Sequence, residues 1–486
     1  MHKTPSILDQ YPHYEINIGI EIHVQLTTKS KIFCASPNIP SQEPNTNICV
    51  ICAGHPGVLP VLNKKVVDHA ILAGLATNCT IAKLCSFARK HYFYPDLPKG
   101  YQITQSDEPI CTEGYIPIRL EDGSIKKIRL IRIHMEEDAG KNIHAAGSNE
   151  SFVDLNRAGT PLLEIVSYPD ITSTYEARTY LKTMHSIMQY LKICSGNMEE
   201  GAFRADTNIS VRKKGATQLG TRCELKNINS FKFIADAIEY EIQRHIELLE
   251  SGQKIQQQTR LWNTKTKTTE AMRGKEEAAD YRYFPEPDLP LIEINEEWIS
   301  RIKKMLPELP HEKLERFTSA KNLTPYEAEI LVDDLELANY FDKASELTQS
   351  KHLINWILRD VMGYLKEHKL SLIEFKVTPK KLAHIVELLD SGAINGNAAK
   401  LVFEEVAASG AEPDAVVKEK GLEQIGSADE LEAIVKEIIE HNPNQVAQYK
   451  AGKDKLFGFF VGQAMQKTKG NANPKMLQDL IKKHLQ

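Results

Sequence analysis

The N-terminal part of the chain carries a long strand pattern. From residue 15 to residue 26 every second position is apolar, and the positions between them are polar or glycine. A period of two is typical of a strand with one buried face and one more accessible face. The accessible face of this predicted strand carries Glu15, Asn17, Gly19, Glu21, His23 and Gln25.

Other strand and helix patterns follow within the first 295 residues. The sequence predicts further strands over 125–135 and 205–212, and helices over 64–76 and 173–194. Strands and helices that alternate irregularly in this way favour one large α+β unit from about residue 15 to residue 295.

The pattern changes after the proline-rich segment 285–290. Apolar residues then recur with the helical period in short segments such as 325–333 and 352–367. The predicted fold is therefore α+β, with a large N-terminal domain of mixed sheet and helices followed by two all-helical domains. We place these three domains at residues 1–295, 296–408 and 409–486.

Charge divides the last predicted domain. Residues 411–442 carry nine acids against three lysines, whereas residues 450–486 carry eight lysines against two aspartates. The basic end is a candidate surface for nucleic-acid phosphates. A solvated helical face is the competing interpretation.

The composition narrows the class of protein. Of the 486 residues, 42% are hydrophobic and 26% charged, which are ordinary globular values, and the net charge is −5. This charge excludes a protein that coats nucleic acid through bulk charge, so local basic patches would have to serve instead. With no secretory leader, no apolar run of about 20 residues and too few cysteines for a disulfide framework, we expect a cytoplasmic protein without a membrane partner.

Three of the eight cysteines lie close together in a segment rich in turn-forming residues. Cys49 and Cys52 have the CxxC spacing of a zinc knuckle, and Cys34 precedes them by fifteen residues. A structural zinc ion takes four ligands, but Ser36 stands where a fourth cysteine would complete the set, and His55 is a candidate substitute. Both a zinc site and a metal-free remnant of one stay open.

Five short segments are unusually rich in Glu, Asp, Asn, Arg and His. They span residues 21–23, 134–141, 154–164, 200–208 and 224–229. Two carboxylates about 4 Å apart repel each other by roughly 4 kcal/mol at a surface-like dielectric, so such a cluster spreads out, takes up protons or holds a divalent cation. Oxygen ligands with nearby Arg and Lys suit Mg²⁺ together with phosphate. The alternative is a solvated sheet face.

Several motifs are absent. The sequence has no P-loop, so ATP would be held in another way, and it has no GxSxG elbow or Gly/Ser-rich stretch for an amidase nucleophile. A non-catalytic RNA-binding module and a stand-alone phosphotransferase for a small carboxylate stay open as alternatives. Interleaved aromatic and basic residues over 89–105 suit either base stacking or ordinary packing.

Taken together, five segments resemble one known family. In order along the chain, residues 21–23, 94–102, 134–141, 154–164 and 280–290 are similar to the B subunits of aspartyl/glutamyl-tRNA amidotransferases. The resemblance covers essentially the whole chain, and the eleven residues 154–164 are its most specific part.

This resemblance implies a reaction and a set of partners. The enzyme would be a glutamine-hydrolysing, tRNA-dependent amidotransferase, a heterotrimer with an amidase A subunit and a small C subunit. The B subunit would use ATP and Mg²⁺ to phosphorylate the side-chain carboxylate of Glu on tRNA(Gln) or Asp on tRNA(Asn). Ammonia from the A subunit would then displace the phosphate. Which misacylated tRNA is used stays open, and the tail would approach the body of the tRNA.

The resemblance also implies roles for particular residues. Mg²⁺ would be held by Glu21, His23 and Glu136, with Glu137 and Glu164 as further candidate catalytic residues. Contacts to substrate or ATP would come from Arg157, Arg204, Asp206, Lys226 and Asn227. Many members of the family carry a four-cysteine zinc site where this chain has Cys34, Cys49 and Cys52.

Overall fold

The computed structural model describes residues 7–40, 43–144, 150–226, 228, 230–272, 281–424, 428–468, 472 and 474–485. Asn227, Asn229 and Asp280, which belong to the segments singled out in the sequence, lie outside these residues. The chain divides into two compact units, residues 1–321 and 322–486. The first is built on a large sheet and the second is helical, which confirms the predicted α+β class. The boundaries at 295 and 408 stay predictions.

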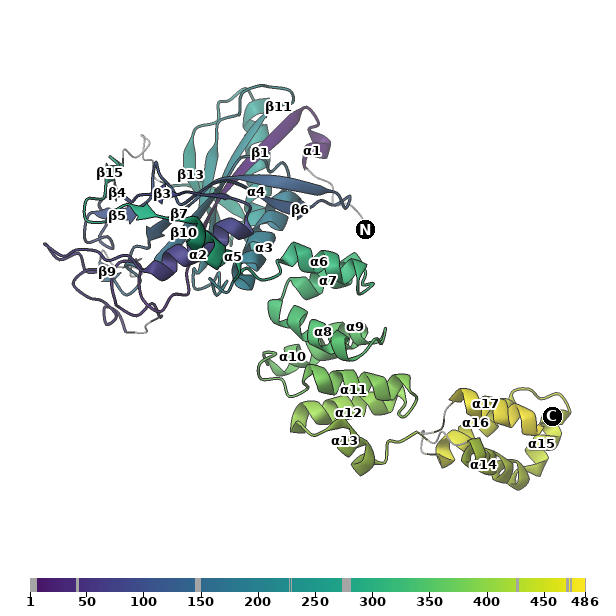
Figure 1. Cartoon of the computed structure of the whole chain (residues 1–486). Helices are drawn as coiled ribbons and strands as arrows, with labels where there is room; N and C mark the ends of the chain where they lie inside the picture. The colour runs from purple at the N-terminus through teal and green to yellow at the C-terminus, as the bar shows by residue number, and fades with distance from the viewer. Residues whose placement is uncertain are drawn as a thin grey trace. The chain divides into compact units, whose positions relative to one another are not determined.

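A nine-stranded sheet forms the centre of the first unit (Figure 1). Its order is β14-β13-β12-β11-β1-β10-β7-β6-β2, and neighbouring strands are antiparallel except β12 and β13. The strands are β1 (Tyr14–Gln25), β2 (Thr80–Ile81), β6 (Cys111–Arg119), β7 (Ile125–Glu137), β10 (Pro161–Ser167), β11 (Phe203–Lys213), β12 (Cys223–Lys226), β13 (Gln258–Asn263) and β14 (Thr268–Ala271).

The apolar side chains of β1 all point to one face of this sheet. Helices cover that face, because apolar side chains must be buried away from water. Ile16, Ile18, Ile20, Ile22 and Val24 are at most 2% exposed and share a core with residues of α2, α3 and α4. Burying each such side chain stabilises the fold by about 1.5–3 kcal/mol, so a one-residue slip of β1 would be strongly unfavourable. The helices of this unit are α1 (Ile7–Gln10), α2 (Lys64–Ala76), α3 (Thr174–Tyr190), α4 (Phe231–Glu250), α5 (Glu296–Lys303) and α6 (Pro310–Ser319).

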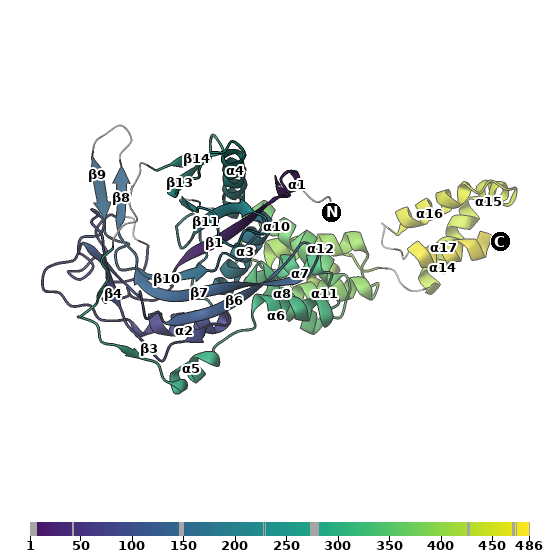
Figure 2. The same ribbon diagram turned by 90° about the horizontal axis from the view of Figure 1, so that it is seen from above.

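Smaller strands complete the first unit. They form a three-stranded sheet of order β15-β4-β5, a pair β16-β3 and the hairpin β8-β9, whose two strands lie side by side in Figure 2. Their bounds are β3 (Leu84–Cys85), β4 (Ala88–His91), β5 (Tyr101–Thr104), β8 (Lys141–His144), β9 (Ser151–Asp154), β15 (Phe284–Pro285) and β16 (Ile292–Glu293).

The second unit consists of short helices. The predicted helix over 352–367 is α9, a π-helical segment and α10 in succession, and the last four helices share a hydrophobic core of their own around Leu431, Phe460 and Leu477. None of the helices within the described ranges of the chain is both long and apolar enough to cross a membrane. The elements are α7 (Pro325–Val332), α8 (Leu335–Leu347), α9 (Leu353–Asn355), the π-helix (Trp356–Val361), α10 (Met362–His368), α11 (Pro379–Asp390), α12 (Gly396–Ser409), α13 (Pro413–Lys420), α14 (Ala428–His441), α15 (Pro443–Lys450), α16 (Leu456–Lys467) and α17 (Pro474–Leu485).

Candidate active site

A row of polar residues crosses four strands of the large sheet. In the antiparallel register His23 on β1 lies opposite Glu164 on β10 and Arg204 on β11, and Glu164 lies opposite His134 on β7. Residues that pair across neighbouring strands project from the same face of a sheet. The row therefore brings together side chains that are up to 181 positions apart in the sequence, from His23 to Arg204.

Two carboxylates and two imidazoles of this face form a compact cluster. His23 Nε2 lies 3.5 Å from a Glu164 oxygen and 3.9 Å from Glu136, two residues beyond His134 on β7. His134 Nε2 lies 3.3 Å from Glu164 and 3.8 Å from Glu136. One ligand atom each from His23, Glu136 and Glu164 can be chosen so that all three lie within 4.8 Å of one another, close enough to share one cation.

The electrostatics of the cluster follow from its burial. Burial and the charge of Glu164 raise the pKa of Glu136. Burial alone would lower the pKa of His23, but the hydrogen bond to Glu164 and the charges of both glutamates raise it to about 9. Burial would likewise raise the pKa of Glu164, but His134 and His23 outweigh it and hold that pKa well below its ordinary value. Positive charge from a proton, an imidazolium or a cation therefore favours the close approach of the two carboxylates.

Lys90 and Thr104 approach the cluster from β4 and β5. Thr104 donates a 3.2 Å hydrogen bond to Glu136. Burial lowers the pKa of Lys90, but the charges of Glu136 and Glu164 overcome this and raise it, and the ammonium group stands 4.6 Å from the centre of the Tyr281 ring. Neither Lys90 nor Thr104 was among the predicted site residues. The interleaved basic and aromatic residues over 89–105 were the signal for this strand.

Glu21 lies on the same face of β1, next to a second group of charges. It accepts a 3.1 Å hydrogen bond from Asn208 and lies opposite Asp206 on β11. Burial, followed by the charges of Glu164, Glu224 and Asp206, raises the pKa of Glu21. The structure thus groups His23 and Glu136 with Glu164, while Glu21 lies two residues before His23 on β1.

Lys226 neutralises part of this second group. Its ammonium group lies 3.0 Å from Asp206 and 3.1 Å from Glu224. Burial lowers the pKa of Lys226, but these two carboxylates more than compensate and raise it. Asp206 and Lys226, two of the candidate substrate contacts, therefore form an ion pair with each other, whereas Asn227 falls outside the described residues.

Glu137 has a different environment from Glu136. Its carboxylate pairs with Lys99 and accepts a 2.9 Å hydrogen bond from the Ile103 backbone, so it ties β7 to β5. Among the contacts of the described residues, none links Glu137 to His23 or Glu164. Glu137, a further candidate catalytic residue in the sequence, therefore lies outside the group formed by His23, Glu136 and Glu164.

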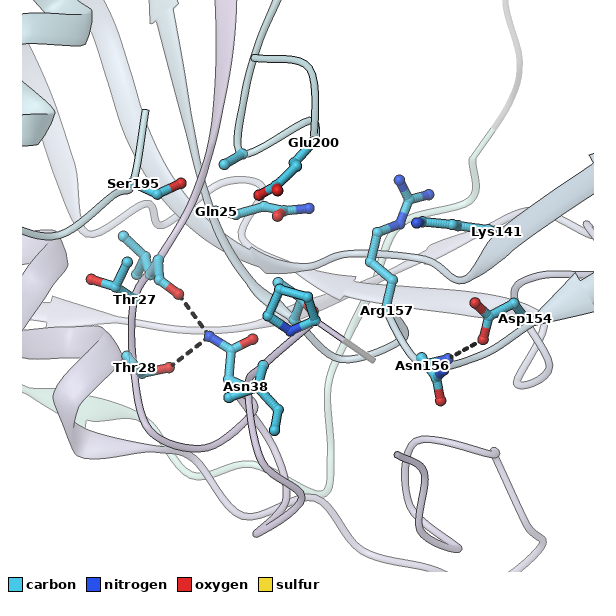
Figure 3. A pocket seen from close by; sticks show the side chains of 15 residues that line it. Gln25, Thr27, Thr28, Asn38, Lys141, Asp154, Asn156, Arg157, Ser195 and Glu200 are labelled. Atoms are coloured by element: carbon cyan, nitrogen blue, oxygen red, sulfur yellow. Dashed lines mark hydrogen bonds between the residues drawn. The ribbon is translucent and has the colours of Figure 1, made fainter. Parts of the chain in front are cut away.

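A pocket of about 430 Å³ lies beside the end of β1 (Figure 3). Gln25, two residues after His23 on β1, lines it, and so do Lys141 and Arg157. The Arg157 guanidinium donates to the backbone oxygens of Ala139 at 2.9 Å and Gly140 at 2.6 Å. Asp154 and Glu200 also line the pocket, so its two positive side chains stand beside two carboxylates. The guanidinium of Arg157 and the ammonium of Lys141 are the groups in it that could meet a phosphate.

The three predicted thiols also come together. Sγ of Cys52 lies 3.6 Å from Sγ of Cys49, and one ligand atom each from Cys34, Cys49 and Cys52 falls within 4.8 Å of the others. Hydrogen bonding from Cys34, helped by the Cys49 backbone and the charge of Lys31, outweighs burial and lowers the pKa of Cys52 to about 4. Ser36 Oγ lies 3.9 Å from Cys52 Sγ.

The thiol cluster fits a metal ion in its donor chemistry. Three thiolates would be balanced by one divalent cation and by Lys31, which is fully buried and donates to the Asn47 backbone at 3.0 Å. Among the described residues, the group here that is close enough to share a metal ion consists of Cys34, Cys49 and Cys52. His55 is exposed and does not belong to that group. Ser36 is therefore better placed than His55 at the fourth corner.

Comparison with known proteins agrees with the sequence resemblance. The family described as the GatB/GatE catalytic domain matches residues 16–300, and the GatB domain matches residues 339–485. The B subunit of the aspartyl/glutamyl-tRNA(Asn/Gln) amidotransferase of Thermodesulfovibrio yellowstonii is 51% identical over 473 residues, which cover 97% of this chain and 99% of that protein. The proteins of the same name from Geobacter sp. (strain M21) and Chlorobaculum tepidum are 52% and 49% identical, with the same coverage. This chain therefore belongs to the family of the B subunits of aspartyl/glutamyl-tRNA(Asn/Gln) amidotransferases.

Proposed function

We propose that the cluster of His23, Glu136 and Glu164 is the place where this subunit activates the carboxylate of a misattached amino acid. As a member of its family, the chain is one subunit of a glutamine-hydrolysing, tRNA-dependent amidotransferase, a ligase that forms C–N bonds. The observation that carries the proposal is the approach of three ligand atoms, from His23, Glu136 and Glu164, within 4.8 Å of one another on one face of the sheet.

The substrate is the side chain of Glu on tRNA(Gln), Asp on tRNA(Asn), or both. ATP phosphorylates this carboxylate, and ammonia then displaces the phosphate to give Gln-tRNA(Gln) or Asn-tRNA(Asn). The ammonia comes from the amidase A subunit of a heterotrimer that also contains a small C subunit. This division of labour agrees with a chain that carries no amidase nucleophile motif.

Mg²⁺ is the cation proposed for the cluster, where it would neutralise the phosphoryl group and hold the substrate carboxylate in line with it. The ligands would be His23, Glu136 and Glu164, with Glu21 available from the neighbouring pair on β1. Two carboxylates, an imidazole and room for water suit a hard divalent cation, and the imidazole makes Mn²⁺ a suitable replacement in an assay.

Positive side chains next to the cluster would bind the phosphates of ATP. Arg157 and Lys141 line the pocket, Arg204 borders His23, and Lys226 stands beside Asp206. A guanidinium presents paired donors that match phosphate oxygens, so Arg157 and Arg204 are the stronger candidates for direct contact. The thiol cluster, which packs against Leu155 and Ala158 and so supports the segment that carries Arg157, is proposed as a zinc site completed by Ser36 or water.

The decisive experiment separates carboxylate activation from glutamine hydrolysis in the reconstituted complex. Glu136→Gln and His23→Ala should remove ATP-dependent formation of the activated carboxylate, trapped as a hydroxamate with hydroxylamine, because each deletes a cation ligand. Each misacylated tRNA is supplied separately, which also identifies the substrate. Asp170→Asn is the matched control, since Asp170 pairs with Arg129 elsewhere on the sheet and should behave like the unmodified protein.

Hydrolysis of glutamine is measured on the same samples. If Glu136→Gln lowers hydroxamate formation and glutamine hydrolysis by equal factors with assembly intact, the assignment of the cluster to carboxylate activation is wrong. Full hydroxamate formation by Glu136→Gln and His23→Ala would refute the proposal directly.

A further inference from the structure

Asp138 is a buried carboxylate directly after β7 that has no place in the cation cluster. Its side chain is 6% exposed. Its backbone is fixed on both sides, because Asp138 N–H donates to Thr160 at 2.8 Å and its carbonyl accepts from Gly159 N–H at 3.0 Å. The carboxylate therefore has little freedom to turn toward a ligand.

One oxygen of Asp138 meets donors from three separate parts of the fold. Gln25 donates to Oδ2 at 2.8 Å and Arg204 at 3.1 Å, while Arg157 Nε stands 3.6 Å away. Asp138 thus links the cation cluster to the pocket. Its partners Gln25 and Arg204 lie next to His23, and its partner Arg157 lines the pocket.

The two arginines need this negative charge to stay together. Arg157 lines the pocket with Lys141, and Arg204 reaches the same Asp138 oxygen as Arg157, so the two guanidiniums lie close together and repel each other. A carboxylate between the guanidiniums cancels part of that repulsion. It accepts a hydrogen bond from Arg204 and forms an ion pair with Arg157, whose own hydrogen bonds go to the backbone oxygens of Ala139 and Gly140. The arginine side chains remain 27% and 35% exposed, so they can meet a ligand that Asp138 itself cannot reach.

We propose that Asp138 is a positioning residue that holds Arg157 and Arg204 toward the phosphates of a nucleoside triphosphate in the adjoining pocket. The inference rests on the proposed function, because that function supplies the nucleotide. Asp138 orients the two guanidinium groups before the nucleotide binds, and it takes no part in the reaction itself. Its loss should therefore weaken nucleotide binding more than it slows the bound complex.

The test is a mutant cycle in the reconstituted complex, with ATP varied at saturating glutamine and misacylated tRNA. Asp138→Asn keeps the shape and removes the charge, and it should raise KM for ATP at least about tenfold while kcat changes less than about threefold. In a background of Arg157→Met and Arg204→Met, which keep the aliphatic stems, the same change should alter KM for ATP less than about twofold. Asp138 would then have no guanidinium left to hold.

If Asp138 only stabilised the fold, different changes in KM for ATP and kcat would be expected. Equal losses from Asp138→Asn in both backgrounds, or a fall in kcat without a change in KM for ATP, would overturn the inference. Asp170→Asn serves as the control, since it breaks an Asp–Arg pair of the same kind outside the pocket. If Asp138→Asn does not fold, Arg157→Met and Arg204→Met decide alone: an unchanged KM for ATP in both would overturn the inference.

The outcomes also distinguish this inference from the proposed function. Loss of carboxylate activation in Glu136→Gln with an unchanged KM for ATP in Asp138→Asn removes the inference and leaves the function. Retained activation in Glu136→Gln with a raised KM in Asp138→Asn removes the cluster's assignment and leaves the positioning role.

Discussion

Substitution of Glu241 in α4 tests how this helix stabilises the strands β12 to β14, of which β12 carries Lys226. Its carboxylate is fully buried, accepts from Thr269 at 2.7 Å and pairs with Arg244, Arg260 and His245. Cys223, Glu241 and His245 are also close enough for a cation, but the two guanidiniums already neutralise the carboxylate. The group therefore serves as an anchor between α4 and the strands β12 to β14.

The pKa of Glu241 gives the magnitude. Burial raises this pKa, but the close contact of His245 and the hydrogen bond and charge of Arg244 lower it from 4.5 to about 2. A pKa lowered from 4.5 to about 2 on folding corresponds to about 3 kcal/mol of stability at neutral pH. Because the folded-state pKa lies below the unfolded one, this stability is present above pH 4.5 and is lost as the pH falls toward about 2.

Glu241→Gln should therefore lower the free energy of unfolding by about 3 kcal/mol at pH 7, and the difference from the unmodified protein should shrink below pH 4.5. Urea unfolding followed by tryptophan fluorescence measures this, since Trp262 and Trp298 both belong to the first unit. Glu247→Gln, an exposed change on the same helix, should alter stability by less than about 0.5 kcal/mol. A loss below about 1 kcal/mol at pH 7, or one that is the same at pH 3, would refute the reasoning.

Three further results are expected. Gly114→Ala should lower the stability measured by thermal unfolding by about 1–3 kcal/mol, because a Cβ there would stand 2.4 Å from Cys79 Sγ. Gly458→Ala is the control, since its Cβ would meet open space and should not lower stability. Equal melting temperatures of the two variants would contradict this. Ser36→Cys should raise the zinc affinity of the thiol cluster at least about tenfold in competition with a chromogenic chelator, and no gain would speak against a tetrahedral arrangement. Removal of residues 410–486 should weaken tRNA binding and reduce its salt dependence while amidation at saturating tRNA persists, and an unchanged affinity would exclude a tRNA-binding role for the basic tail.

Long periodic elements could be predicted from the sequence nearly to the residue. The alternation over 15–26 predicted a strand that the structure places at Tyr14–Gln25, and the helix predicted over 64–76 is α2. Asn63 contributes to that agreement, since its side chain accepts from Lys65 N–H and marks the helix start.

The arrangement of the site could be predicted only in part. Composition and the family resemblance identified Glu136, His23 and Glu164 as candidates, but a single sequence does not reveal which strands are neighbours, so the contact of His134 with Glu164 could not be foreseen. The four residues of β4 are too few to show a period, which hid Lys90. Asp138 stood in a recognised segment, yet its partners come from three distant strands and loops.

The position of β1 in the sheet has a consequence for synthesis on the ribosome. β1 is made first of the sheet strands, but its two neighbours are β10 and β11, and roughly 140 residues separate it from the nearer one. At about 5–20 residues per second this delay lasts roughly 7–28 s, during which neither hydrogen-bonding edge of β1 has its strand partner. Such a nascent segment is a natural substrate for chaperones that bind extended apolar chains. Expression of the first unit should accordingly depend more on elongation speed and chaperone supply than expression of the helical unit, whose contacts are local.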